Sequence, residues 1–102
     1  MKIALDVDGV VTEHYPFWSF FTETMMKAGH EIYIITDIKQ IHRDFRIAEL
    51  KHYKIHYKEM IITPDKRSFC EELEIDFAID DMPEYYYDAK NVVKFTIVTI
   101  NE

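Results

Sequence analysis

Six side chains that could carry chemistry follow short apolar stretches of this 102-residue sequence. They comprise four carboxylates, one hydroxyl and one ammonium: Asp6, Asp8, Thr36, Lys66, Asp80 and Asp81. Four carboxylates held close together repel one another unless a cation lies between them. A hard divalent cation that prefers oxygen ligands, most simply Mg²⁺, would remove that repulsion. Histidine and cysteine are absent from the ends of these stretches, so the set does not favour zinc.

Groups of these types are suited to phosphoryl transfer. An aspartate can attack phosphorus and form an aspartyl-phosphate. A metal ion and a lysine can neutralise the phosphoryl group and the charge of the transition state. A second carboxylate can give a proton to the leaving oxygen and later take one from water. Gly9 permits a tight turn that points neighbouring N–H groups at a phosphate, so the sequence favours a phosphate site here.

The periodicity of apolar residues predicts the elements that must position these groups. Short apolar runs predict strands at 3–7, 32–35, 60–62, 77–79 and 92–100. Helical spacing predicts helices at 17–28, 41–53 and 65–73, with a further short helix opened by Pro83. Alternation of this kind predicts a single three-layer, Rossmann-like α/β domain, with about five mostly parallel strands and helices on both faces. The carboxyl ends of parallel strands share one edge, which would gather the six side chains there.

The same spacing assigns a face to each helix. In the first helix the recurring positions are Phe17, Phe20, Phe21, Thr24, Met25 and Ala28, and Gly29 supplies the stop. In the second helix the apolar face comprises Ile41, Phe45, Ala48 and His52, with the charged residues opposite. Two aromatic groups remain open to either a packing or a binding role, namely Tyr15 with Phe17 and Trp18, and the run from Tyr85 to Tyr87.

Composition and charge exclude several classes of function. The formal net charge of −7 argues against a broad nucleic-acid-binding surface, which requires a basic face. No apolar run approaches the roughly 20 residues that cross a bilayer, and Asp6 interrupts the N-terminal apolar run too early for a signal peptide. The single cysteine, Cys70, fits a reducing compartment. We therefore expect a cytoplasmic protein without a membrane segment.

Four short motifs resemble those of the haloacid dehalogenase superfamily. The stretch Asp6-Val7-Asp8-Gly9-Val10 resembles its first motif, an Asp-x-Asp after an apolar strand. Thr36 resembles the second motif, Lys66 the third and the pair Asp80-Asp81 the fourth, all in the family's order. The motifs frame residues 3–81, which is most of the chain. The resemblance implies a Mg²⁺-dependent phosphatase that acts through an aspartyl-phosphate on a small phosphorylated metabolite or nucleotide.

Carried over to this chain, the resemblance implies a role for each aspartate. Asp6 would be the nucleophile and a metal ligand. Asp8 would be the general acid and base and would bind the metal through its backbone carbonyl. An aspartate at position 8, rather than a residue typical of dehalogenases, favours phosphatase chemistry. Asp80 would be the main acidic metal ligand, with Asp81 binding directly or through water.

The phosphate-binding residues follow from the same resemblance. Thr36 and Lys66 would hold the phosphoryl oxygens, with Gly9 and Asp37 beside them. Lys58 and Arg67 are the basic residues that compete with Lys66 for the third motif. The stretch 81–84, Asp-Met-Pro-Glu, also resembles the small deoxynucleotidase-like branch of the superfamily.

One departure from the family concerns the cap domain. Only a loop lies between Gly9 and Pro16, and only one helix and one strand are predicted between Thr36 and Lys66. We therefore expect residues 1–102 to form a single capless domain with an open site. Selectivity would then come from a large substrate, from the loop at 13–18, or from a neighbouring subunit of a homo-oligomer that covers the site.

Two other classes of function compete with the phosphatase. A receiver-like signalling module also carries an acidic pocket on alternating strands and helices. In a receiver, however, the phospho-acceptor follows the third strand, the threonine the fourth and the lysine the fifth. In this chain the Asp-x-Asp follows the first predicted strand. A non-catalytic phosphate- or Mg²⁺-binding protein could retain the fold, since fold does not guarantee activity. The intact acidic set argues against that alternative, because clustered carboxylates without a metal cost stability.

Overall fold

The computed structural model describes residues 1–86 and residue 100. Its strands are β1 (Lys2–Leu5), β2 (Glu31–Thr36), β3 (Glu59–Ile62) and β4 (Phe77–Ile79). Its helices are α1 (Tyr15–Lys27), α2 (Arg43–His52) and α3 (Lys66–Glu72). Three single turns complete the described part: η1 (Val7–Val11), η2 (Gln40–His42) and η3 (Pro83–Tyr86).

The four strands form one parallel sheet in the order β3-β2-β1-β4. From β1 the chain moves outward through β2 to β3, then returns to place β4 on the other side of β1. The strand order therefore reverses at β1. In open α/β sheets, ligands bind outside the carboxyl ends of the strands at such a reversal.

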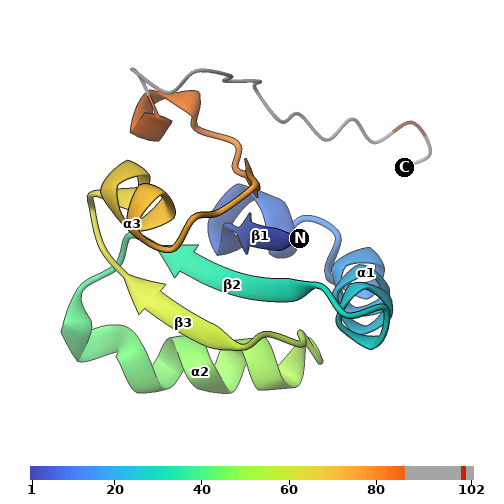
Figure 1. Cartoon of the computed structure of the whole chain (residues 1–102). Helices are drawn as coiled ribbons and strands as arrows, with labels where there is room; N and C mark the ends of the chain where they lie inside the picture. Colours follow the sequence, from blue (N-terminus) through green and yellow to red (C-terminus); the bar gives the residue numbers. More distant parts are fainter. Residues whose placement is uncertain (87–99, 101–102) are drawn as a thin grey trace.

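Residues that alternate along the strands pack on opposite faces of the sheet. On one face, Ile3 and Ile34 join a cluster that includes Trp18 of α1 and Leu50 of α2. On the other face, a smaller cluster built on Ala4, Tyr33, Ile35 and Ile61 packs against Cys70 and Leu73 at α3. Figure 1 shows the same layers, with α2 and α3 on opposite sides of the strands.

The structure confirms the expected α/β class and the parallel sheet, with four described strands in place of about five. The expected fifth strand at 92–100 lies outside the described residues except for Ile100. The first strand ends at Leu5, two residues earlier than expected, because the chain enters the turn η1 at Val7. Between β2 and α3 lie only η2, α2 and β3, as the sequence predicts. No helix in the described part of the chain is long and apolar enough to span a membrane.

The inward face predicted for α2 is wrong. Ile41 and Phe45 are 84% and 73% exposed, and the buried residues of α2 are Arg46 and Leu50. Ile41 lies in η2, before the α-helix begins at Arg43, so it does not share the helical phase of the residues that follow. A charged residue takes the inner position because its guanidinium finds carboxylate partners there.

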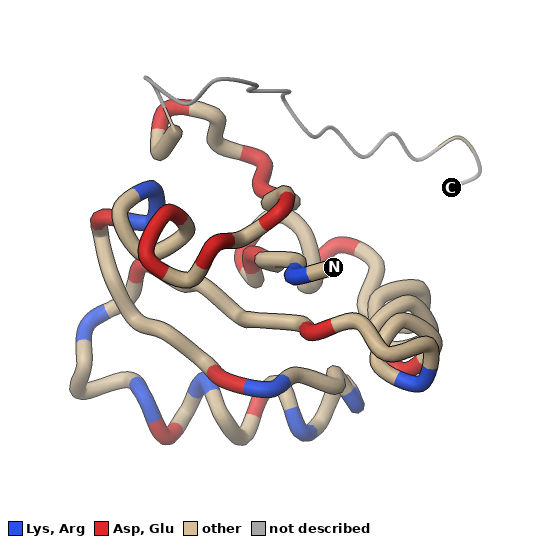
Figure 2. The backbone as a smooth tube through the Cα atoms, in the orientation of Figure 1, with Lys and Arg blue, Asp and Glu red and all other residues tan. Residues whose placement is uncertain are grey.

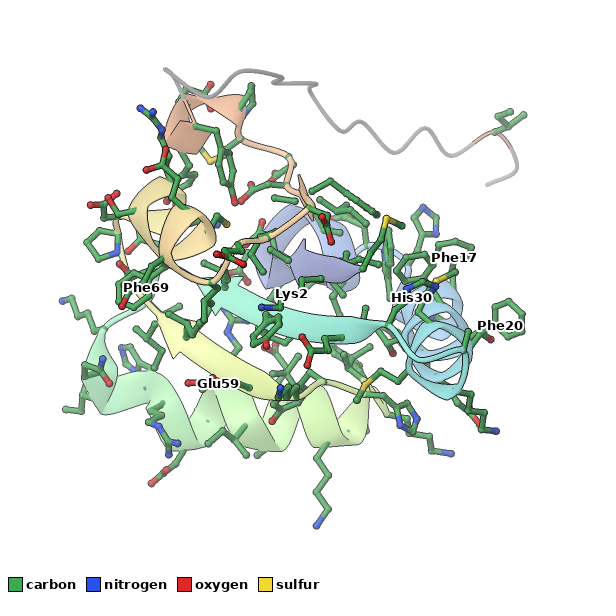
Figure 3. The ribbon with its side chains drawn as sticks, in the orientation of Figure 1. Lys2, Phe17, Phe20, His30, Glu59 and Phe69 are labelled. Carbon is green, nitrogen blue, oxygen red and sulfur yellow. The ribbon has the colours of Figure 1, made fainter. Side chains whose placement is uncertain are left out.

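The inner face of α1 matches the expected one only in part, since Phe21 and Met25 pack against the core. Phe17 and Phe20 are exposed and point away from the sheet in Figure 3, whereas Trp18 and Thr22 are buried. The Thr22 hydroxyl donates to the Trp18 carbonyl at 2.8 Å and accepts the His56 N–H at 3.0 Å. These bonds allow a polar side chain to occupy the inner face. The sequence left Trp18 open to a packing or a binding role. Because Trp18 is buried in the core, the structure supports packing.

The burial in α2 gives a stability prediction. Leu50→Ala removes a fully buried side chain and should lower the free energy of unfolding by about 2–5 kcal/mol. Phe45→Ala, on the outer face of the same helix, should change it by less than about 0.5 kcal/mol. Urea denaturation of both variants measures the difference. Equal losses would contradict the inward face described here.

Candidate active site

Three aspartates meet at the carboxyl ends of β1 and β4. Asp6 follows β1, whereas Asp80 and Asp81 follow β4, the strand that pairs with β1 in parallel register. The Asp6 N–H donates to the Ile79 carbonyl at 3.0 Å, which extends the pairing of the two strands into the site. One carboxylate oxygen from each aspartate lies within 4.8 Å of the others. This group, Asp6 with Asp80 and Asp81, is called the acidic cluster below.

Lys66 inserts its ammonium into the acidic cluster. It is the first residue of α3, and only 2% of its surface is exposed. Its Nζ donates to Asp6 Oδ1 at 2.9 Å and to Asp80 Oδ2 at 2.8 Å. Of the basic residues that competed for this place, Lys58 pairs with Glu31 and Arg67 pairs with Glu71 on the surface. The structure thus places Lys66, and neither competitor, beside the acidic cluster.

The charges of this cluster do not balance. If all three carboxylates were ionised, the one ammonium would leave an excess of two negative charges in a largely buried space. Burial raises the pKa of Asp6 from 3.8 to about 7, with Asp80 adding to the rise and Lys66 opposing it. Burial lowers the pKa of Lys66, but its ion pairs with Asp6 and Asp80 outweigh burial and leave it raised. A divalent cation would compensate the excess charge and favour the carboxylate form of Asp6.

Gly9 lets the turn η1 approach the acidic cluster closely. Its φ of +83° lies in the left-handed region, which side chains disfavour. A Cβ at this position would lie 2.1 Å from Asp81 Oδ2, so only glycine leaves room for that carboxylate. The Gly9 N–H donates to Thr12 Oγ1 at 3.1 Å. Gly9, which the sequence placed beside a phosphate, therefore leaves room for Asp81 in this structure. The Gly9 N–H is already bonded to Thr12.

The second expected motif lies at the end of β2. Thr36 is the last residue of that strand, buried, and its carbonyl accepts the Thr63 N–H at 3.0 Å. Asp37 follows in the loop and is exposed. Since β2 pairs with β1, both residues lie along the same edge of the sheet as Asp6.

Two tyrosines of η3 also contact the site, and the sequence left their role open between packing and binding. The Tyr85 ring lies over Lys66 Nζ, 4.2 Å from its centroid, and its hydroxyl donates to Asp37 Oδ2 at 2.7 Å. That hydrogen bond, with burial, raises the pKa of Tyr85 to about 12. The Tyr86 hydroxyl donates to Asp80 Oδ2 at 3.4 Å. In Figure 2, acidic positions recur along the segment that joins β4 to η3.

Asp8 lies apart from the acidic cluster. Its carboxylate turns toward α2, where Arg46 donates from Nη1 to Oδ1 at 3.3 Å and from Nη2 to Oδ2. Arg46 Nη1 also donates to Glu49 Oε1 at 2.5 Å. Burial lowers the pKa of Arg46, but its hydrogen bonds to Asp8 and Glu49 outweigh burial and leave it raised. The sequence placed Arg46 with the charged outer face of its helix, so no signal there indicated this contact.

Comparisons of the chain with models of protein families, with curated proteins and with solved structures find no match. Four of the expected side chains come together, namely Asp6, Lys66, Asp80 and Asp81, and Gly9 lies against Asp81.

The raised pKa of Asp6 predicts how stability depends on pH without metal. Between about pH 4 and pH 7 the native protein holds a proton on Asp6 that the unfolded chain releases, so this group lowers stability as pH rises through that range. Asp6→Asn cannot titrate. Its stability relative to the natural protein should therefore increase from pH 4 to pH 7, measured by urea denaturation in EDTA. A difference that stays constant with pH would show that Asp6 is not perturbed by its surroundings.

Proposed function

We propose that this protein is a Mg²⁺-dependent phosphomonoester hydrolase that acts through an aspartyl-phosphate on Asp6. The observation that carries the proposal is a cluster of three aspartates, two of them paired with one buried lysine, at the reversal of the strand order. The resemblance of four ordered motifs to the haloacid dehalogenase superfamily supports it independently of the geometry.

The acidic cluster has the chemistry that Mg²⁺ requires. Its donors are carboxylate oxygens from Asp6, Asp80 and Asp81, and hard oxygen ligands suit this ion. The excess of two negative charges matches the charge of one divalent cation. When bound, Mg²⁺ would neutralise phosphoryl oxygens and favour in-line displacement at phosphorus. The backbone carbonyl of Asp8 is a further candidate ligand.

In the first step, a carboxylate oxygen of Asp6 forms a bond to phosphorus as the bond from phosphorus to the leaving oxygen breaks. Asp8 gives its proton to that leaving oxygen, which departs as an alcohol. Lys66 lies beside Asp6 and balances the negative charge of the phosphoryl group. Thr36, at the end of the neighbouring strand, is positioned on the same edge to hold a phosphoryl oxygen.

In the second step, water attacks the phosphorus of the aspartyl-phosphate and Asp8 accepts its proton. The bond between phosphorus and the Asp6 oxygen breaks, which releases inorganic phosphate and restores the Asp6 carboxylate. The proton accepted from water leaves Asp8 in its acid form for the next cycle. Atoms balance as one phosphomonoester and one water giving one alcohol and one phosphate.

The proposed substrate is a small phosphorylated metabolite or nucleotide. One α-helix, with at most a single turn beside it, connects each pair of consecutive described strands, so no domain is inserted between them in residues 1–86. Tyr85 lies over the Lys66 ammonium that the phosphoryl group needs, so the ring must move aside or share that contact when the substrate binds. An aromatic ring at this place could then pack against the substrate.

Metal binding gives a direct stability prediction. Mg²⁺ that binds only the native state should stabilise it by about 2.7 kcal/mol at a concentration of 100 times Kd. Asp81→Asn removes one charge from the acidic cluster and should weaken this effect, measured as the rise in melting temperature across a Mg²⁺ titration. Asp44→Asn makes the same substitution at a fully exposed side chain and should respond as the natural protein does. An unchanged melting temperature in the natural protein would count against a metal site.

Activity tests the proposed reaction itself. The natural protein should release phosphate from p-nitrophenyl phosphate or from a nucleoside monophosphate with Mg²⁺, and EDTA should abolish that release. Asp6→Asn should lose the activity because it lacks the nucleophile, whereas Asp44→Asn should retain it. Binding of Mg²⁺ without turnover of any substrate would instead favour the non-catalytic alternative. Equal activity in Asp6→Asn and the natural protein would exclude Asp6 as the nucleophile.

A further inference from the structure

The proposed general acid and base is held by a residue from a distant element. Asp8 lies in η1, directly after β1, whereas Arg46 lies on α2, 38 positions later in the chain. Two guanidinium nitrogens of Arg46 donate to the two carboxylate oxygens of Asp8. A planar guanidinium that contacts both oxygens fixes the orientation of a carboxylate as well as its position.

Arg46 is itself held in place. Its side chain is only 6% exposed, although arginine is seldom buried, and Glu49 one turn further along α2 accepts from its Nη1. Among the residues that the structure describes, the Arg46 Nε has no hydrogen-bond partner. The buried guanidinium is therefore anchored through its terminal nitrogens, between Glu49 on one side and Asp8 on the other.

Asp8 presents the opposite situation. Its side chain is 69% exposed, and the Arg46 contact is the ion pair that restrains it in the described part of the chain. An exposed aspartate samples several rotamers unless a partner selects one. A group that transfers protons must instead stay within hydrogen-bond reach of the reacting oxygen.

We infer that Arg46, supported by Glu49, is a positioning residue that sets the orientation of the Asp8 carboxylate, the proposed general acid and base. The inference rests on the proposed phosphatase function and adds to it a residue that no sequence motif identified. Arg46 acts through Asp8 and does not itself touch the substrate.

The test uses two substrates that differ in their need for a general acid. An alkyl phosphomonoester has a basic leaving oxygen that must be protonated, whereas p-nitrophenolate leaves readily without a proton. Arg46→Lys keeps the buried charge but cannot contact both oxygens of Asp8. It should lower kcat/KM for the alkyl substrate about tenfold to a hundredfold and for p-nitrophenyl phosphate by less. A merely structural role would lower both equally, and that result would overturn the inference.

A double-mutant cycle with Asp8→Asn makes the test specific to this pair. If Arg46 acts through Asp8, then Arg46→Lys should cause no further loss of kcat/KM in the Asp8→Asn background. Losses that multiply would overturn the inference, as would full activity in Arg46→Lys alone. Glu49→Gln, at a more exposed position, should show a smaller loss with the same preference between substrates. If Arg46→Lys does not fold, Glu49→Gln still tests the inference. An unchanged ratio of kcat/KM between the two substrates in Glu49→Gln would then overturn it.

Arg43→Lys is the matched control, since Arg43 lies on the same helix with an exposed side chain and should leave both substrates unaffected. The rise in melting temperature with Mg²⁺ should be the same in Arg46→Lys as in the natural protein, because Arg46 does not contact the acidic cluster. A natural protein inactive on both substrates would overturn the proposed function and the inference together. If the natural protein is active and Arg46→Lys keeps full activity on both substrates, only the inference would be overturned.

Discussion

The buried ammonium of Lys66 is the constraint on which the site depends. A charge removed from water is tolerated only with close partners of opposite sign, and here Asp6 and Asp80 supply them. Those three residues come from the ends of β1 and β4 and the start of α3, so one interaction ties three segments together. The same contacts leave the site with more carboxylates than cations. This imbalance makes the arrangement suited to a divalent ion and unfavourable without one.

The topology of the sheet explains why these residues can meet. Because β4 returns to the side of β1 opposite β2, aspartates separated by more than 70 positions follow adjacent parallel strands. Close approach at the turn then depends on Gly9, which leaves the space that Asp81 occupies. On the other side of β1, the turn η1 directs Asp8 toward α2. The edge of the sheet thus holds two groups of charges, the acidic cluster around Lys66 and the chain of contacts from Glu49 through Arg46 to Asp8.

The sequence predicts the parts of this structure that depend on local patterns. Continuous apolar runs predict the four described strands, and the rule that parallel strands share one edge places Asp6, Asp80 and Asp81 together. The inward faces of the helices were harder to predict. Ile41 and Phe45 suggested an inward face for α2 that is exposed in the structure. Apolar patterns do not predict a buried arginine such as Arg46, because its inward position depends on partners in other segments. Tyr85 was likewise unassigned, because its contacts with Lys66 and Asp37 join residues that are near only in the fold.

The central claim is that Asp6 becomes phosphorylated during turnover, and trapping that intermediate tests it most directly. The protein would be mixed with Mg²⁺ and a phosphomonoester, quenched, and treated with borohydride, which reduces an acyl phosphate of aspartate to homoserine. Peptide mass spectrometry then identifies the altered position. Homoserine is expected at position 6, dependent on both Mg²⁺ and substrate. Phosphate release without any altered aspartate, or homoserine at position 80 instead, would contradict it.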